Sequence, residues 1–227
     1  ADNLRRKRQQ AIQLADDFLR SVFLDMFGDP VTNPKGWDCR PLESLVSKPI
    51  TYGILKPEEF VQGGVPMLRI QDLKNGIIDE SKAFHLVSEK LSSQYKRTIL
   101  EGGEIVISLV GSIGIVARVP FKLLGANVHR NLGVIKLKEK RFAEYVTSLM
   151  QMPHFMTILE RVSKGGVHKL LNLADLKEVE VPLPSTELIE KFTEIKKQAC
   201  KLALANESTT KELLFDSLSQ KAFAGEL

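Results

Sequence analysis

Apolar side chains near the N-terminus repeat with the period of an α-helix. Within residues 4–27 they recur at spacings of three and four positions, which is the pattern of a coiled-coil seam. The seam residues are Ile12, Ala15, Leu19, Val22 and Met26. Phe18, Phe23 and Phe27 widen the apolar surface beyond this stripe, so the helix needs a partner helix to cover it. Gly28-Asp29-Pro30 is a typical helix stop.

A second long helix is predicted over residues 185–222. Ser185 follows the proline-bounded end of a strand and is a suitable N-cap. The predicted pairing positions are Phe192, Ile195, Ala199 and Leu202, followed after a polar interruption by Leu214 and Leu218. At the rise of an α-helix this element would be roughly 55 Å long. Its natural cover is the other long helix or another chain.

The C-terminal ends of the two helices resemble each other. Ser21-Val22 and Met26-Phe27-Gly28-Asp29 align, at one constant offset, with Ser217-Leu218 and Ala222-Phe223-Ala224-Gly225. This similarity predicts a repeated element on both sides of an intervening domain. Chance similarity between two amphipathic helices is the alternative.

The middle of the chain mixes short strand-like and helix-like runs. Strands are predicted at 65–70, 104–110, 115–119, 134–137 and 179–183, and helices at 142–150 and 153–161. We therefore expect an α+β fold, in which a globular domain with an irregular, curled sheet is flanked by long coiled-coil-forming helices. The expected domains are residues 1–30, the end of one long helix; 31–184, the globular domain; and 185–227, the second long helix.

Composition places the chain among folded soluble proteins, with 43% hydrophobic and 26% charged residues. No run approaches the roughly 18 consecutive apolar residues of a membrane span, and the polar N-terminus is no signal peptide.

Cys39 and Cys200 lack metal-ligand spacing, so we interpret them as reduced thiols of a cytoplasmic protein. Residues 37–184 carry 20 Lys and Arg against 16 Asp and Glu, a modest indication of a nucleic-acid partner.

Motifs that carry catalysis are missing from the sequence. It contains no Walker loop, GxGxxG, HExxH, CxxC or GxSxG, and no motif that binds a flipped base for amino methylation. Glu58 followed by Asp72-Leu73-Lys74 loosely fits a Mg²⁺-dependent nuclease, but Lys74-Asn75-Gly76 is equally an ordinary turn. The four histidines show no ligand spacing. We expect no catalytic residue, no metal and no cofactor bound by this chain.

Several polar, glycine-containing loops of the middle domain offer the groups that read DNA. Arg, Asn, Gln and Ser reach base edges, while Lys, Arg and the free N–H groups of glycine loops reach phosphates. Solvated turns are the alternative interpretation of each loop. The predicted DNA contacts are Tyr52, Gly53, Arg69, Gln71, Ser112, Arg118, Asn127, His129, Arg130, Asn131, Lys164, His168 and Lys169.

A set of ordered landmarks runs through almost the whole chain. They are Ile50 to Gly53, Gly64 to Leu73, Leu100 to Ser108 with Gly111 to Gly114, Leu173 to Leu176, Val179 to Pro184, Ile189, and Leu218 to Leu227. In this order the sequence resembles the specificity (S) subunits of type I restriction–modification enzymes. It departs from the usual pattern at Glu104, where an Asp is common, and at the helix entry after Ser185.

The resemblance implies a DNA-recognition role without catalysis. Such subunits have two target recognition domains, each followed by a long helix; the helices pair as a spacer, and each domain reads one half of a bipartite target. Modification (methyltransferase) subunits dock on them with S-adenosylmethionine, and restriction subunits bring ATP and Mg²⁺. This chain resembles half of such a subunit, so two copies are expected to pair through their helices, which requires a palindromic, interrupted target.

Two other functions stay open from the sequence. One is a helical scaffold whose middle domain binds protein, and the other is the Mg²⁺-dependent nuclease or a methyltransferase fragment. Because the first residue is Ala, the chain is either a natural half-subunit or a piece of a longer one. The DNA target and the division of the loops between bases and phosphates do not follow from the sequence.

Overall fold

The computed structural model describes residues 2–74, 76–80, 82–162 and 171–204. These residues form two compact units, one made of 2–38 with 183–204 and the other of 39–182. Several expectations lie outside the described residues. They are the second helix beyond residue 204, the pairing positions Leu214 and Leu218, and the contacts Lys164, His168 and Lys169.

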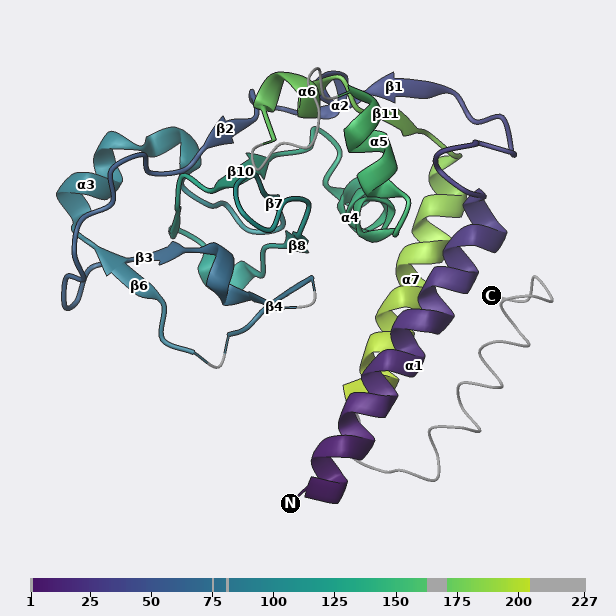
Figure 1. Cartoon of the computed structure of the whole chain (residues 1–227), viewed down its shortest axis with the longest axis horizontal. Coiled ribbons are helices and arrows are strands. Elements are labelled where there is room, and N and C mark those ends of the chain that lie inside the picture. The colour runs from purple at the N-terminus through teal and green to yellow at the C-terminus, as the bar shows by residue number, and fades with distance from the viewer. Residues whose placement is uncertain (1, 75, 81, 163–170, 205–227) are drawn as a thin grey trace. The chain divides into compact units, whose positions relative to one another are not determined.

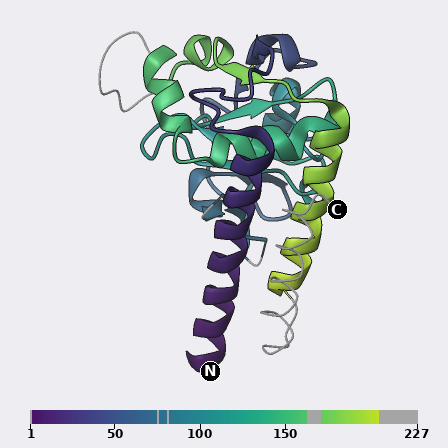
Figure 2. The same cartoon turned by 90° about the vertical axis from the view of Figure 1, so that its right-hand side faces the viewer.

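The first unit is a pair of helices, α1 (Asp2–Phe27) and α7 (Thr186–Leu204), which run side by side in opposite directions (Figures 1 and 2). Phe192 of α7 contacts two rings of α1 at centroid distances of 5.5 Å to Phe23 and 5.3 Å to Phe27. The partner helix that the apolar surface of α1 needs is therefore present within the chain.

The phase of the buried stripe differs from the expected seam. Of the expected pairing positions, the buried ones are Ala15, Val22, Phe192, Ile195 and Ala199, and the half-buried ones are Ile12, Leu19, Met26 and Leu202. Phe18, Phe23 and Phe27 are buried instead. The large rings turn inward because an aromatic side chain buries far more apolar area than the aliphatic side chains beside it.

Local sequence determines where both helices begin and end. Gly28 has φ +78°, and its N–H donates to the carbonyl of Leu24 at 2.9 Å, which is a glycine helix stop. The indole Nε1 of Trp37 donates to the carbonyl oxygen of Phe27 at 2.9 Å. At the start of α7, the hydroxyl of Ser185 accepts the N–H of Leu188 at 3.3 Å, as its N-cap role requires.

The second unit, residues 39–182, is a mixed α+β domain (Figure 1). Its helices are α2 (Leu42–Leu45), α3 (Glu89–Gln94), α4 (Ala143–Gln151), α5 (Phe155–Val162) and α6 (Leu173–Lys177). Its strands are β1 (Cys39–Pro41), β2 (Thr51–Tyr52), β3 (Val65–Leu68), β4 (Leu73–Lys74), β5 (Ile77–Ile78), β6 (His85–Val87), β7 (Ile105–Ser108), β8 (Val116–Arg118), β9 (Asn127–Val128), β10 (Leu132–Ile135) and β11 (Glu180–Pro182). The expected fold class is confirmed, and the strands form small separate sheets.

Those sheets have the orders β2-β10-β7-β8, β6-β3-β9, β1-β11 and β4-β5. Every pair is antiparallel except β3 with β9, which is parallel. The strand predicted over 65–70 stops at Leu68 because the next residues form a tight turn, in which the N–H of Asp72 donates to the carbonyl of Arg69 at 3.0 Å. The strands that the sequence did not predict have only two or three residues, too few for a hydrophobic period.

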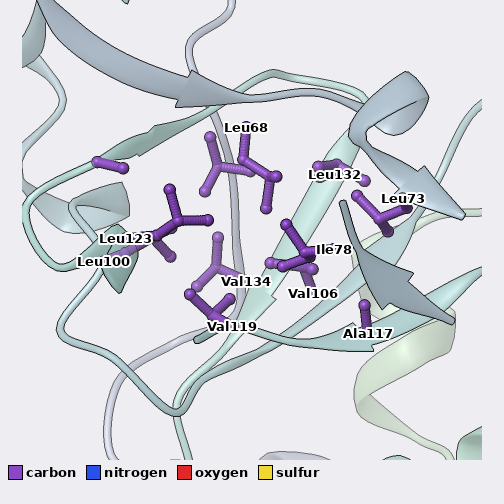
Figure 3. Packing of buried hydrophobic residues seen from close by; sticks show 12 residues of the cluster. Leu68, Leu73, Ile78, Leu100, Val106, Ala117, Val119, Leu123, Leu132 and Val134 are labelled. Atoms are coloured by element: carbon purple, nitrogen blue, oxygen red, sulfur yellow. The ribbon is translucent and has the colours of Figure 1, made fainter. Parts of the chain in front are cut away.

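One hydrophobic core joins the two larger sheets (Figure 3). It takes Leu68 from β3 and Val128 from β9, and it takes Val106 from β7 and Val134 from β10. All four side chains are 2% exposed or less. The loops that leave these strands are consequently held by a packed scaffold.

Candidate nucleic-acid interface

Two chain segments that are far apart in sequence leave the small sheet side by side. In the parallel pair β3 and β9, Met67 lies beside Asn127 and Leu68 beside Val128. Parallel strands end at the same edge, so Arg69 and His129 emerge together. The N–H of His129 donates to the carbonyl of Leu68 at 2.9 Å, which continues the pairing by one residue.

A third segment, around Ile54, joins this edge. The N–H of Ile54 donates to the carbonyl of Val128 at 2.6 Å, and the N–H of Arg130 donates to the carbonyl of Ile54 at 3.1 Å. A Cβ atom on Gly53 would lie 1.9 Å from the carbonyl oxygen of Val128, so only glycine permits this approach. Tyr52, one residue earlier, is half-buried.

Four basic side chains gather here, and we call Arg69, His85, His129 and Arg130 the cationic cluster. His85 reaches it through the pairing of β3 with β6, where it lies opposite Met67. Arg130 is exposed, and its Nη1 donates to the carbonyl of Leu55 at 3.4 Å. Burial, followed by the charges of Arg130, Arg69 and His85, lowers the pKa of His129 below its ordinary value. The two arginines of this cluster favour an anion, and the guanidinium group matches phosphate through two parallel hydrogen bonds.

His129 of this cluster has a defined hydrogen bond. Nδ1 of His129 accepts the N–H of Asn131 at 3.3 Å, which assigns the ring as neutral with its proton on Nε2. Asn131 is half-buried, and Gln71, two residues after Arg69, is exposed. The sequence-predicted Tyr52, Arg69, Gln71, His129, Arg130 and Asn131 therefore come from three segments that meet at one edge.

The glycine loop after β7 is connected to the same region. The N–H of Leu109 donates to the carbonyl of Asn131 at 2.8 Å, and the N–H of Gly114 donates to the carbonyl of Ser108 at 3.0 Å. The Ser108 hydroxyl donates to the carbonyl of Ser112. Ser112 is exposed at the tip of this loop, where its side chain is accessible to a ligand.

The structure places Arg118 away from this edge. It pairs in register with Ile105, at the end of the β7–β8 hairpin opposite to the loop that holds Ser112. Its guanidinium forms an ion pair with the carboxylate of Glu144 on α4. Its charge is therefore compensated, because α4 packs on β8 and brings the acidic side chain to it.

Burial of Asn127 and Gly53 is what conflicts with their prediction as direct DNA contacts. The side chain of Asn127 is 0% exposed, because β9 is covered within the domain, and so it does not reach a surface ligand. Gly53 is buried and has the steric role described above. Conversely, the sequence did not single out His85 as a site residue, because only the β3–β6 register reveals its place in the cluster.

The acidic residues of the nuclease alternative have structural roles. The carboxylate of Asp72, 3% exposed, accepts the N–H of Arg69 at 2.7 Å. That of Glu58 accepts the N–H of Ser88. Among the described residues, no group of three or more His, Cys, Asp or Glu side chains is arranged to hold a metal ion. Within the same residues, no helix has the length and hydropathy to cross a membrane.

Comparisons with known proteins identify the family of this chain. Residues 34–212 match the profile of the type I restriction modification DNA specificity domain. The chain is 29% identical over 226 residues to the type I restriction enzyme EcoBI specificity subunit of Escherichia coli, covering 93% of this chain and 46% of that protein. It is 28% identical over 168 residues to the MjaIX specificity subunit of Methanocaldococcus jannaschii, covering 71% of this chain and 37% of that protein.

The fold is shared with a solved specificity subunit. The HsdS subunit from Thermoanaerobacter tengcongensis superposes with a TM-score of 0.55 at 20% identity, covering 100% of this chain and 55% of that one. The chain thus spans about half the length of that structure and less than half of both sequence relatives. The resemblance seen in the sequence is confirmed, and a specificity domain agrees with the expectation of a non-catalytic chain. Since the profile covers most of the sequence, this chain belongs to the type I restriction modification DNA specificity domain family.

Proposed function

We propose that this chain reads one half of a bipartite DNA target for a type I restriction–modification complex, through the edge that carries the cationic cluster. The observation that carries the proposal is the convergence of three segments, which brings Arg69, His129 and Arg130 together with the exposed Gln71. Arginine and glutamine are the side chains that pair with guanine and adenine edges, and the cations neutralise phosphates.

The proposal extends to domains and partners. Residues 31–184 would be the target recognition domain. The segments 1–30 and 185–227, which contain α1 and α7, would act as spacers and as docking surfaces for modification subunits. Those partners would supply S-adenosylmethionine, and restriction subunits would supply ATP and Mg²⁺. Two copies would pair through the helices, and such a dimer would read a palindromic target with an interrupted centre.

Arg130→Ala tests the DNA contact directly. The exposed guanidinium should contact a phosphate, so the variant should bind duplex DNA more weakly and release about one counterion fewer. The measurement is the slope of log affinity against log salt, by fluorescence anisotropy with a fixed duplex, for the chain alone and with its modification subunit. Arg97→Ala is the matched control, because Arg97 is exposed on a turn outside the cationic cluster.

Two results of that titration are decisive. Equal slopes for Arg130→Ala and the wild-type chain would contradict the assignment of this edge. A wild-type affinity that does not respond to salt would contradict DNA binding as a whole and favour a protein-interaction module. Mapping methylated sites in DNA modified by the assembled complex then identifies the target.

DNA binding should also strengthen as pH falls. In the free chain the pKa of His129 is lowered, so the ring is neutral near pH 7. A phosphate beside it stabilises the imidazolium and raises the pKa, so binding takes up a proton and affinity rises below neutral pH, by up to about tenfold per pH unit. Anisotropy titrations from pH 8 to pH 6 measure this, and His129→Gln should flatten the profile. An unchanged pH profile in that variant would exclude His129 from the interface.

A further inference from the structure

The turn that follows β3 contains a buried carboxylate beside the cationic cluster. Asp72 is 3% exposed, and its Oδ2 accepts the N–H of Arg69 at 2.7 Å. Its own N–H donates to the carbonyl of Arg69 at 3.0 Å, and its carbonyl accepts the N–H of Asp79 at 2.9 Å. A neutral oxygen could also accept the N–H of Arg69, so the turn does not require a buried negative charge.

The same carboxylate oxygen also faces the side chain of Arg69. Oδ2 of Asp72 lies 3.8 Å from Nε of Arg69. Nε is buried and has no hydrogen-bond partner in the described part of the chain. The Arg69 side chain as a whole is 30% exposed. Neither Nη group shares this enclosure, so the exposed part of the side chain includes the outer end of the guanidinium.

From this geometry we infer that Asp72 is a positioning residue, which holds the Arg69 guanidinium end-on toward a DNA group with two adjacent acceptor oxygen or nitrogen atoms. The inference rests on the proposed function and deepens it. A planar guanidinium group that presents its two Nη groups, here called the fork, matches either guanine O6 and N7 or two phosphate oxygens. Fixing the fork before binding removes the cost of ordering a long side chain in the complex.

Because Asp72 is negatively charged, the direction in which DNA affinity changes when the charge is removed distinguishes two roles for this residue. Removing a carboxylate close to DNA should strengthen binding if electrostatic repulsion were its main effect. A positioning residue predicts the opposite result, because the freed guanidinium loses its orientation. The two roles are therefore distinguished by the direction of the change.

Asp72→Asn and Arg69→Lys are the informative variants. Asparagine keeps the shape and an oxygen that accepts the N–H of Arg69 but loses the charge, while lysine keeps the positive charge but loses the fork. Each should weaken binding to a duplex carrying the methylation-mapped target by about tenfold, the size of one bidentate pair. The double variant should be no weaker than either single variant, because both remove the same oriented contact.

The experiment uses the chain assembled with its modification subunit, in parallel on the target duplex and on a scrambled duplex. A loss confined to the target assigns a base as the acceptor, and an equal loss on both duplexes assigns a phosphate. Asp79→Asn is the control, because it makes the same charge change on a half-buried residue paired with Lys82. It should leave the affinities for the target duplex and for the scrambled duplex unchanged.

Other outcomes overturn the inference. Unchanged or tighter binding by Asp72→Asn would do so, as would additive losses in the double variant or a melting temperature that falls in step with affinity. If the wild-type complex binds neither duplex, the proposed function fails instead, and that result is distinct from all of these.

Discussion

Phe192→Ala should destabilise the helix pair by about 3–5 kcal/mol, the usual cost of removing a buried phenylalanine ring. Phe192 is 1% exposed and contacts both Phe23 and Phe27, whose own centroids lie 4.9 Å apart. Truncation leaves a cavity at the centre of this three-ring cluster. With typical domain stabilities of about 5–15 kcal/mol, the variant should unfold at a much lower urea concentration.

The chain provides its own reporter for this measurement. Trp37 is the single tryptophan, and its Nε1 donates to the carbonyl of Phe27, so its fluorescence reports the end of α1. Phe121→Ala is the matched control, because Phe121 is 67% exposed and should change stability by less than about 0.5 kcal/mol. Equal urea midpoints for the two variants would contradict the packing described for Phe192.

The same variant bears on assembly. If two copies pair through their helices, sedimentation velocity should detect a dimer of the wild-type chain and a larger monomer fraction of Phe192→Ala. A wild-type chain that sediments only as a monomer, with a footprint over one unrepeated half-site, would contradict self-association.

Lys136→Met should destabilise the second unit, residues 39–182, by about 3 kcal/mol or more, because it leaves a buried carboxylate without its cation. Lys136 is 7% exposed, and its Nζ donates to the carbonyl of Ile99 and to Glu101 Oε1, each at 2.8 Å. It also lies 3.8 Å from Glu104, whose side chain is 5% exposed. Oε1 of Glu104 accepts the N–H of Glu101, whereas Oε2 is buried without a hydrogen-bond partner in the described part of the chain. Lys136 therefore supplies the positive charge that faces this carboxylate.

A rescue variant and a control make this prediction specific. Replacing Glu104 with Gln in the Lys136→Met background should recover most of the lost stability, since no buried charge then remains. Lys48→Met should cost no more than about 1 kcal/mol, because Lys48 is 57% exposed in its pair with Glu101. Urea denaturation followed by circular dichroism measures all of them. A Lys136→Met variant as stable as Lys48→Met would contradict the account.

The pH dependence of this network has a defined sign. Hydrogen bonds from Lys136 and then Lys48 lower the pKa of Glu101 to about 2. A lowered pKa means that the contribution of Glu101 to stability is complete above its ordinary value near 4.5 and is lost as pH falls toward 2. Acid unfolding of Lys136→Met should show less of this decline, because the larger of the two hydrogen bonds is already absent.

The sequence by itself determined the features that depend on neighbouring residues. The three-and-four spacing of apolar side chains determined both helices. Gly28 determined the end of α1 and Ser185 the start of α7, because capping is decided within one helical turn. The longer strands of the middle domain were predicted for the same local reason. The family resemblance also followed from ordered motifs, and the profile match confirmed it.

Only the tertiary structure decided which polar residues share a surface. Arg69 and His129 meet because β3 and β9 pair in parallel, and strands of two to four residues carry too little pattern to reveal their partner. The same pairing buries Asn127, and the packing of α4 on β8 neutralises Arg118 with Glu144. Even the phase of α1 was decided by packing, since Phe192 selects the phenylalanine rings over the aliphatic seam. A periodic pattern specifies which residues form an element, whereas the neighbour of each side chain depends on contacts between distant segments.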